Sequence, residues 1–196
     1  MNRKIQLFED GRKREVTRTI VRDIVQVFKD EDEGEYYLPN YVNDEHDFYN
    51  FAGLDMDLAI ELVITPKEDI PNFKVDANYF RDDDIIQIEI EYNTKNKKKL
   101  LYDLVGELNE VIAHEIKHVN QNITGSHDLN VPEPSDPYEY YTQEHELDAQ
   151  KAGFRRLAKL TKTPMDVVVK RWFKTHKDIH GLTDKESMDV ISKILN

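Results

Sequence analysis

The hydrophobic pattern of the chain changes period near residue 95, and this change restricts the fold class more than any other feature. Before it, residues 57–64 (DLAIELVI) and 85–92 (IIQIEIEY) alternate apolar and polar side chains, and residues 75–80 form a further short segment of strand type. After it, apolar residues recur every three or four positions, as in amphipathic helices. We therefore predict an α+β fold in which a small, mostly antiparallel sheet is followed by helices.

Helices are predicted on both sides of the strands. Residues 15–29 have helical spacing, and four more helical segments cover 98–121, 138–160, 164–179 and 183–195. The connection 122–137 is rich in Gly, Pro, Asn and Asp. It either covers a site or is an ordinary surface loop. With 196 residues we expect one domain, 1–196, with a sheet-containing part at about 1–96 and a helical part at about 97–196.

Composition and charge exclude several classes of function. The net charge of −12 argues against nucleic acid or an anionic membrane as the main partner. The chain has no cysteine, which excludes disulfides and thiolate zinc sites. The N-terminus has no apolar segment of the secretory type, and no run of 18 apolar residues occurs. We therefore expect a cytoplasmic protein, or one in the host cytoplasm if the chain is encoded by a phage.

Residues 111–119, VIAHEIKHV, place polar side chains on the helix predicted for 98–121. His114 and His118 project about 40° apart, so both imidazoles can bind one ion. Glu115 falls inside the apolar stripe, where a carboxylate is costly unless it has a partner. A zinc ion with its water would supply that partner. The alternative is a helix rim with two exposed histidines and a glutamate that reaches solvent.

A catalytic zinc ion usually has three protein ligands, so a third is expected on a later helix. Residues 140–154, YYTQEHELDAQKAGF, contain several suitable side chains. Glu144 and Asp148 are four positions apart and share a face. Glu146 lies about 200° around the helix from Glu144, so only one of the two can face the metal.

Together, HExxH and the later E-x-x-x-D pattern resemble the gluzincins, the thermolysin-like branch of the zincin metallopeptidases. The resemblance covers roughly residues 85–155 and implies a small standalone zincin-like domain with one catalytic Zn²⁺. It implies that His114, His118 and Glu144 are the metal ligands. It also implies that Asp148 holds the spare ring nitrogen of His114, as outer-sphere carboxylates commonly do.

The resemblance implies a zinc metalloendopeptidase that acts on a peptide or protein substrate. Zinc would polarise the carbonyl and acidify water, and Glu115 would act as general base. Tyr140, Tyr141, His127 and His145 are candidates to stabilise the oxyanion or bind substrate. Alternatively, the chain is a catalytically silent zincin-fold binding or regulatory protein, or a phage assembly protein. A zinc ion closed by a fourth protein ligand, such as His127 or His145, would be structural.

The strand at 85–92 is expected to serve this reaction. In the resembling family an edge strand in this part of the sheet binds extended substrate, and the polar face of 85–92 suits an exposed edge. The alternative is that this strand is paired on both sides. The sequence does not indicate the substrate, the cleavage specificity or the oligomeric state.

Overall fold

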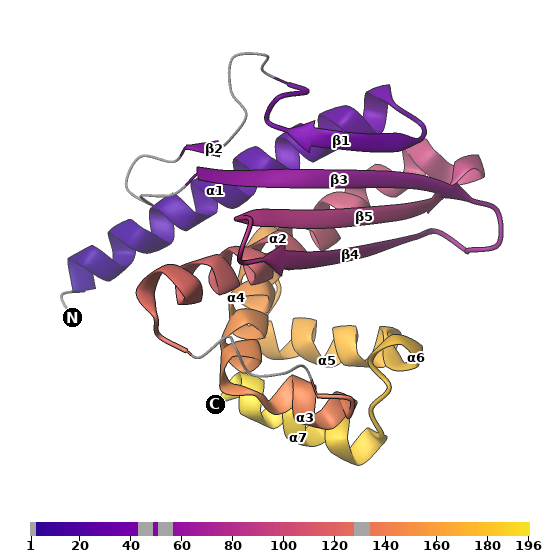
Figure 1. Ribbon diagram of the computed structural model, residues 1–196. Coiled ribbons are helices and arrows are strands. Elements are labelled where there is room, and N and C mark those ends of the chain that lie inside the picture. The colour runs from indigo at the N-terminus through magenta and orange to yellow at the C-terminus, as the bar shows by residue number, and fades with distance from the viewer. Residues whose placement is uncertain (1–2, 43–48, 51–56, 128–133) are drawn as a thin grey trace. The chain divides into compact units, whose positions relative to one another are not determined.

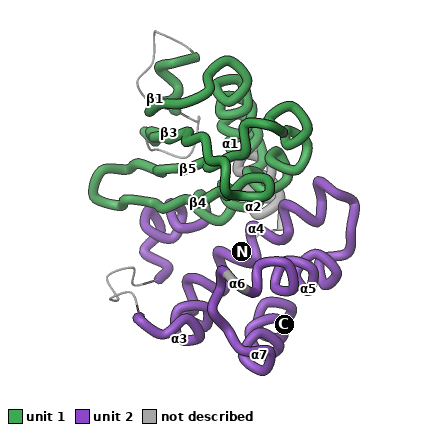
Figure 2. Tube along the Cα trace, turned by 90° about the vertical axis from the view of Figure 1, so that its right-hand side faces the viewer, with its two compact units in different colours: residues 1–116 green, residues 117–196 purple. Residues whose placement is uncertain are grey.

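The computed structural model describes residues 3–42, 49–50, 57–127 and 134–196 (Figure 1). The chain divides into two compact units, Met1–Ile116 and Lys117–Asn196 (Figure 2). The first unit contains the sheet and the second is helical, which confirms the α+β class. The division falls inside a helix. The expected single domain, 1–196, with parts at about 1–96 and 97–196, stays a prediction.

The first unit begins with helix α1 (Arg3–Asp30), which includes the predicted segment 15–29. The strands are β1 (Gly34–Leu38), β2 (Tyr49–Asn50), β3 (Asp57–Lys67), β4 (Phe73–Phe80) and β5 (Ile85–Asn93). A 3₁₀ turn, η1 (Thr94–Asn96), leads into helix α2 (Lys97–Thr124), which continues into the second unit. The three predicted strands and the predicted helix at 98–121 are confirmed. Strands β1 and β2 are additional.

The sheet is mixed, with the strand order β1-β3-β5-β4 and β2 paired to β3. Strands β3 and β5 run parallel, and the other pairs are antiparallel. Because β5 has a neighbour on each side, the prediction that residues 85–92 form an exposed edge strand is wrong. The alternation of apolar and polar residues indicates which face of a strand is buried, but it does not indicate which strands pair with it. Among the described strands, β4 is the edge on that side.

The core of the first unit follows the predicted alternation. On β5, Ile86, Ile88 and Ile90 are buried, whereas Glu89 is exposed. Each fully buried side chain of this kind contributes roughly 1.5–3 kcal/mol. The apolar stripes of the helices and of β3 complete the core: Val16, Ile20, Ile24, Val27 and Phe28 of α1, Ile60, Leu62 and Ile64 of β3, and Leu104, Leu108 and Ile112 of α2.

The second unit contains the C-terminal end of α2 and five further helices. These are α3 (Pro137–Thr142), α4 (Glu144–Thr161), α5 (Met165–Thr175), α6 (Lys177–His180) and α7 (Asp184–Leu195). Its apolar cluster is made of Phe154, Ala158, Val168, Val169, Phe173, Leu182, Val190 and Ile194. Residues 128–133 of the long loop lie outside the described residues, so whether this loop covers a site stays a prediction. Among the described helices, none combines the length and the hydrophobicity of a membrane-spanning segment.

The helix predicted for 138–160 is two helices, because the backbone at Gln143 is extended, with φ −61° and ψ 140°. Asp136 caps α3 by accepting hydrogen bonds from the amides of Tyr138 and Glu139. The hydroxyl of Thr142 donates to the carbonyl of Tyr138 at 2.8 Å, a bond that competes with helix continuation. Helix α4 therefore starts afresh at Glu144.

Candidate metal centre

Helix α2 holds both histidines of the HExxH motif on one continuous backbone. Its apolar residues recur at intervals of four, and Leu104, Leu108 and Ile112 are fully buried. This stripe fixes the rotation of the helix, so the position of each polar side chain around it is also fixed. Glu115 lies within the buried side, where its side chain is 8% exposed, as the sequence predicts.

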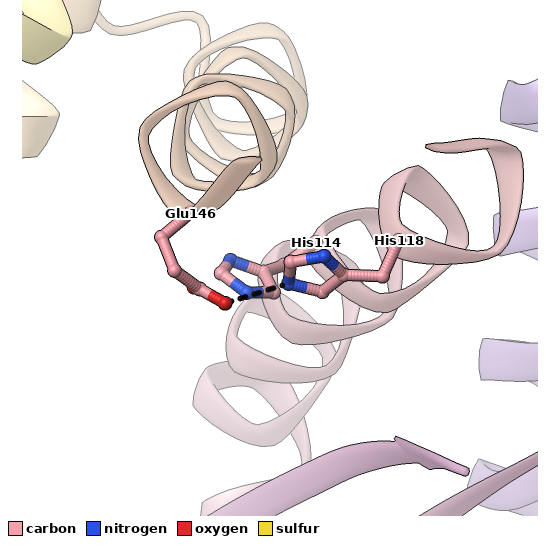
Figure 3. Close-up of side chains that lie close together, drawn as sticks. All are labelled: His114, His118 and Glu146. Atoms are coloured by element: carbon pink, nitrogen blue, oxygen red, sulfur yellow. Dashed lines mark ion pairs between the residues drawn. The ribbon is translucent and has the colours of Figure 1, made fainter. Parts of the chain in front are cut away.

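His114, His118 and Glu146 form a group whose ligand atoms all lie within 4.8 Å of one another (Figure 3). Nε2 of His118 is 3.3 Å from Oε1 of Glu146, and both residues belong to the second unit. With metal–ligand bonds of about 2.0–2.1 Å, tetrahedral coordination separates neighbouring ligand atoms by about 3.3 Å. The pair of His118 and Glu146 already has this spacing.

The third member of this group is the carboxylate of Glu146, where we expected Glu144. The buried face of α4 is a helical stripe made of Glu146, Ala149, Gln150, Gly153, Phe154 and Ala158. Glu146 continues this stripe to the first turn of the helix, whereas Glu144 lies on the exposed side. The sequence argument that only one of the two can face the metal holds. The rotation of α4 is set by Phe154 and the small residues, and it selects Glu146.

Asp148 forms ion pairs with Lys117 and His127, and its expected contact with the ring of His114 stays a prediction. Oδ2 of Asp148 is 2.7 Å from Nζ of Lys117 and 3.6 Å from Nε2 of His127. Burial by itself would raise the pKa of Asp148. The hydrogen bond and charge of Lys117, the charge of His127 and a hydrogen bond from Gln121 outweigh burial and lower the pKa. Asp148 is therefore stabilised in its ionised form, and the positive charge of Lys117 balances its negative charge.

Gln121 is the buried residue that connects His118 to α4, and the sequence reasoning missed it. Its side chain has no exposed surface. Oε1 lies 2.9 Å from Nδ1 of His118, and Nε2 donates to the backbone carbonyl of His145 at 2.9 Å. The available signal was its spacing, because a residue three positions after His118 lies on the same face of the helix.

Two further carboxylates lie close to the histidines along α2. Oε1 of Glu115 is 3.9 Å from Nε2 of His114. Glu110, one turn before His114, is buried. Burial raises its pKa to about 8, and the negative charges of Glu107 and Glu115 add to this effect. The side chain of Glu110 is therefore mostly protonated at neutral pH, which its position in the sequence alone did not indicate.

The four oxyanion or substrate candidates occupy different surroundings. Nε2 of His145 is 3.5 Å from Oε1 of Glu146, and its ring is 5.9 Å from that of His118. His127 pairs with Asp148, as described above. The ring of Tyr140 packs edge-on against Tyr141.

Tyr141 in turn packs against Phe173 in the apolar cluster of the second unit. Of the four candidates, the structure therefore shows His145 next to a residue of the metal group. Within the described ranges, the group itself contains neither His127 nor His145.

Two imidazoles and one carboxylate form a donor set that suits Zn²⁺, and three protein ligands leave a coordination position for water. The carboxylate of Glu146 is buried and the two histidines are partly buried, a setting in which a carboxylate needs favourable partners. A bound cation would be one such partner. A comparison of the chain with protein-family models, with curated proteins and with solved structures finds no match. Function is therefore inferred from the residues of the chain and their geometry.

Proposed function

We propose that this chain is a zinc-dependent hydrolase that cleaves peptide bonds, with His114, His118 and Glu146 as metal ligands. The observation that carries this proposal is the convergence of the ligand atoms of these three side chains within 4.8 Å, with the buried Glu115 3.9 Å from His114. HExxH motifs combine a metal pair with a general base in this way. The arrangement supports a zincin metallopeptidase of the gluzincin type.

The proposed chemistry assigns the proton transfers to Glu115. Zinc, when bound, lowers the pKa of water and polarises the scissile carbonyl. Glu115 accepts a proton from the attacking water as its oxygen joins the carbonyl carbon, and then delivers a proton to the amine as the C–N bond breaks. The burial of Glu115 strengthens its electrostatic interactions at the site. His145, a neighbour of Glu146, is the best-placed candidate to donate to the oxyanion.

The gluzincin assignment departs from the family pattern at α4. The E-x-x-x-D spacing of Glu144 and Asp148 led to the resemblance, but the carboxylate at the histidines is Glu146. Its counterpart four residues later is Gln150, which is buried. The proposal therefore depends on HExxH and on a glutamate from a later helix, and it does not depend on the E-x-x-x-D pair.

A catalytically silent protein with a structural zinc ion is the second candidate. Structural zinc sites are normally closed by four protein ligands. The group in the described residues has three, and His145 pairs with Glu146 without joining it. This open position favours catalysis, as does the presence of Glu115, because a purely structural site has no need of a buried base.

The test combines metal analysis with a cleavage screen. The wild-type protein and Glu115→Gln are purified, assayed for zinc, and incubated with a proteome-derived peptide library. We expect about one zinc ion per chain in both proteins. We expect cleavage by the wild type to fall about 10²- to 10⁴-fold in the variant. Glu89→Gln, at an exposed position on β5, is the matched control and should cleave normally.

Two results would overturn the proposal. A wild-type protein that binds no zinc would exclude the metal centre. Cleavage that persists unchanged in Glu115→Gln would show that this carboxylate is not the base.

A further inference from the structure

The side chain of Gln121 is placed to orient one of the proposed metal ligands, His118. An inference about this role rests on the proposed metal centre. Its amide is fully buried and bonded at both ends. One end meets Nδ1 of His118, and the other meets the carbonyl of His145, the residue directly before Glu146. One side chain therefore connects the proposed ligand His118 to the residue that precedes Glu146 on another helix.

The hydrogen-bond partners fix which way the amide of Gln121 points. A backbone carbonyl can only accept, so the atom facing the carbonyl of His145 must be the NH₂ group. The carboxylate of Asp148 is also a hydrogen-bond partner of Gln121, and it too can only accept. Both acceptors require the NH₂ group as their donor, which leaves the carbonyl oxygen Oε1 for His118.

This orientation in turn fixes the tautomer of His118. Oε1 of Gln121 can only accept, so Nδ1 of His118 must carry a hydrogen and donate it across 2.9 Å. In the neutral ring the lone pair is then on Nε2, the nitrogen that lies 3.3 Å from Oε1 of Glu146. Two acceptors at this distance repel each other unless a proton or a metal ion lies between them, and the proposed zinc ion would serve this purpose.

We propose that Gln121 is a positioning residue of the metal centre, which holds His118 as the Nδ1–H tautomer and ties it to the start of α4. Histidine ligands commonly use a carboxylate or a carbonyl for this purpose. Here the direct partner is a neutral amide. The negative charge lies one hydrogen bond further away, on Asp148, where Lys117 pairs with it.

The first test reads the tautomer in the metal-free protein, and it does not depend on activity. Long-range ¹H–¹⁵N NMR of the His118 ring is recorded at a pH where the imidazole is neutral, for the wild type, Gln121→Met and Gln121→Glu. The wild type should show the Nδ1–H form. Gln121→Met, which cannot accept, should release the ring into a mixture of tautomers. Gln121→Glu, which can accept, should retain the Nδ1–H form.

An Nε2–H ring in the wild type would overturn the inference, and this measurement remains possible if a variant does not fold. An unchanged tautomer in Gln121→Met would overturn it equally.

The second test measures zinc affinity by competition with a chromophoric chelator. Gln121→Met should bind zinc about 10- to 100-fold more weakly than the wild type, the usual effect of removing an outer-sphere partner. The matched control is Gln150→Met, because Gln150 is also buried but its amide has no hydrogen-bond partner among the described residues. The control should keep the wild-type affinity.

An equal loss in both variants would mean that burial, and not the hydrogen bonds of Gln121, determines the affinity. The possible failures are also distinguishable. If the wild type itself binds no zinc, the proposed function fails. If the wild type binds zinc and Gln121→Met binds it equally well, the positioning role alone fails.

Discussion

Glu110 should make the stability of the metal-free protein fall as the pH rises. Burial, with the nearby charges of Glu107 and Glu115, raises its folded-state pKa from 4.5 to about 8. Between these two values the folded protein holds a proton that the unfolded chain has released. The free energy of unfolding therefore decreases with pH, by at most about 1.4 kcal/mol per pH unit. Over the full window this amounts to on the order of 5 kcal/mol.

The test is urea unfolding of the wild type and Glu110→Gln from pH 4 to 9, with a chelator present. The amide has the shape of the protonated acid, so the two proteins should have similar stability near pH 4 and diverge as the pH rises. Titrating groups remote from Glu110 contribute equally to both, so the difference isolates Glu110 together with its coupling to Glu107 and Glu115. The exposed carboxylate Glu89 provides the control, Glu89→Gln. A difference between wild type and Glu110→Gln that stays constant across this range would refute the reasoning.

Three further predictions concern single side chains of the second unit. Gln150→Met should raise the free energy of unfolding by about 1–2 kcal/mol in urea unfolding, because it removes a buried amide without hydrogen bonds to described residues. His145→Ala should leave the zinc stoichiometry unchanged by metal analysis, since His145 lies outside the three-ligand group, and a loss of the metal would indicate a closed structural site. Thr183→Ala should lower the thermal unfolding temperature, at a cost of about 1 kcal/mol, because Thr183 and Glu186 form a capping box at the start of α7.

Periodicity was sufficient to predict the elements with long, regular patterns. Strands β3 and β5 and helix α2 lie where the sequence places them, because one face of each is packed with apolar side chains. The short strands β1 and β2 were missed, because a few residues cannot establish a period. The position of β5 within the sheet was predicted wrongly, because pairing depends on distant segments.

The candidate site was predictable as far as one helix determines it. His114, Glu115 and His118 occupy the expected positions because the geometry of α2 alone relates them. The choice between Glu144 and Glu146 depends on the rotation of a second helix, and we followed the E-x-x-x-D pattern. The buried stripe of α4 that includes Phe154 also includes Glu146, so this stripe predicts the ligand better than the E-x-x-x-D pattern does.

Residues that act through tertiary contacts were beyond the sequence argument. Gln121 can connect His118 to α4 only because the fold brings the carbonyl of His145 to 2.9 Å from its amide nitrogen. The two residues are 24 positions apart in the sequence. The raised pKa of Glu110 likewise depends on how completely the fold removes its carboxyl group from water. Helical spacing places Gln121 on the same face as His118, but neither property follows from spacing alone.

The most direct test of the metal centre compares zinc binding by the wild type, Glu146→Gln and Glu144→Gln. The two substitutions remove the same charge from the same turn of α4, so they differ only in the face they affect. We predict that wild type and Glu144→Gln bind one zinc ion per chain with similar affinity. Glu146→Gln should lose more than the roughly 10- to 100-fold typical of an outer-sphere partner. Loss of zinc binding in Glu144→Gln with binding retained in Glu146→Gln would contradict the account.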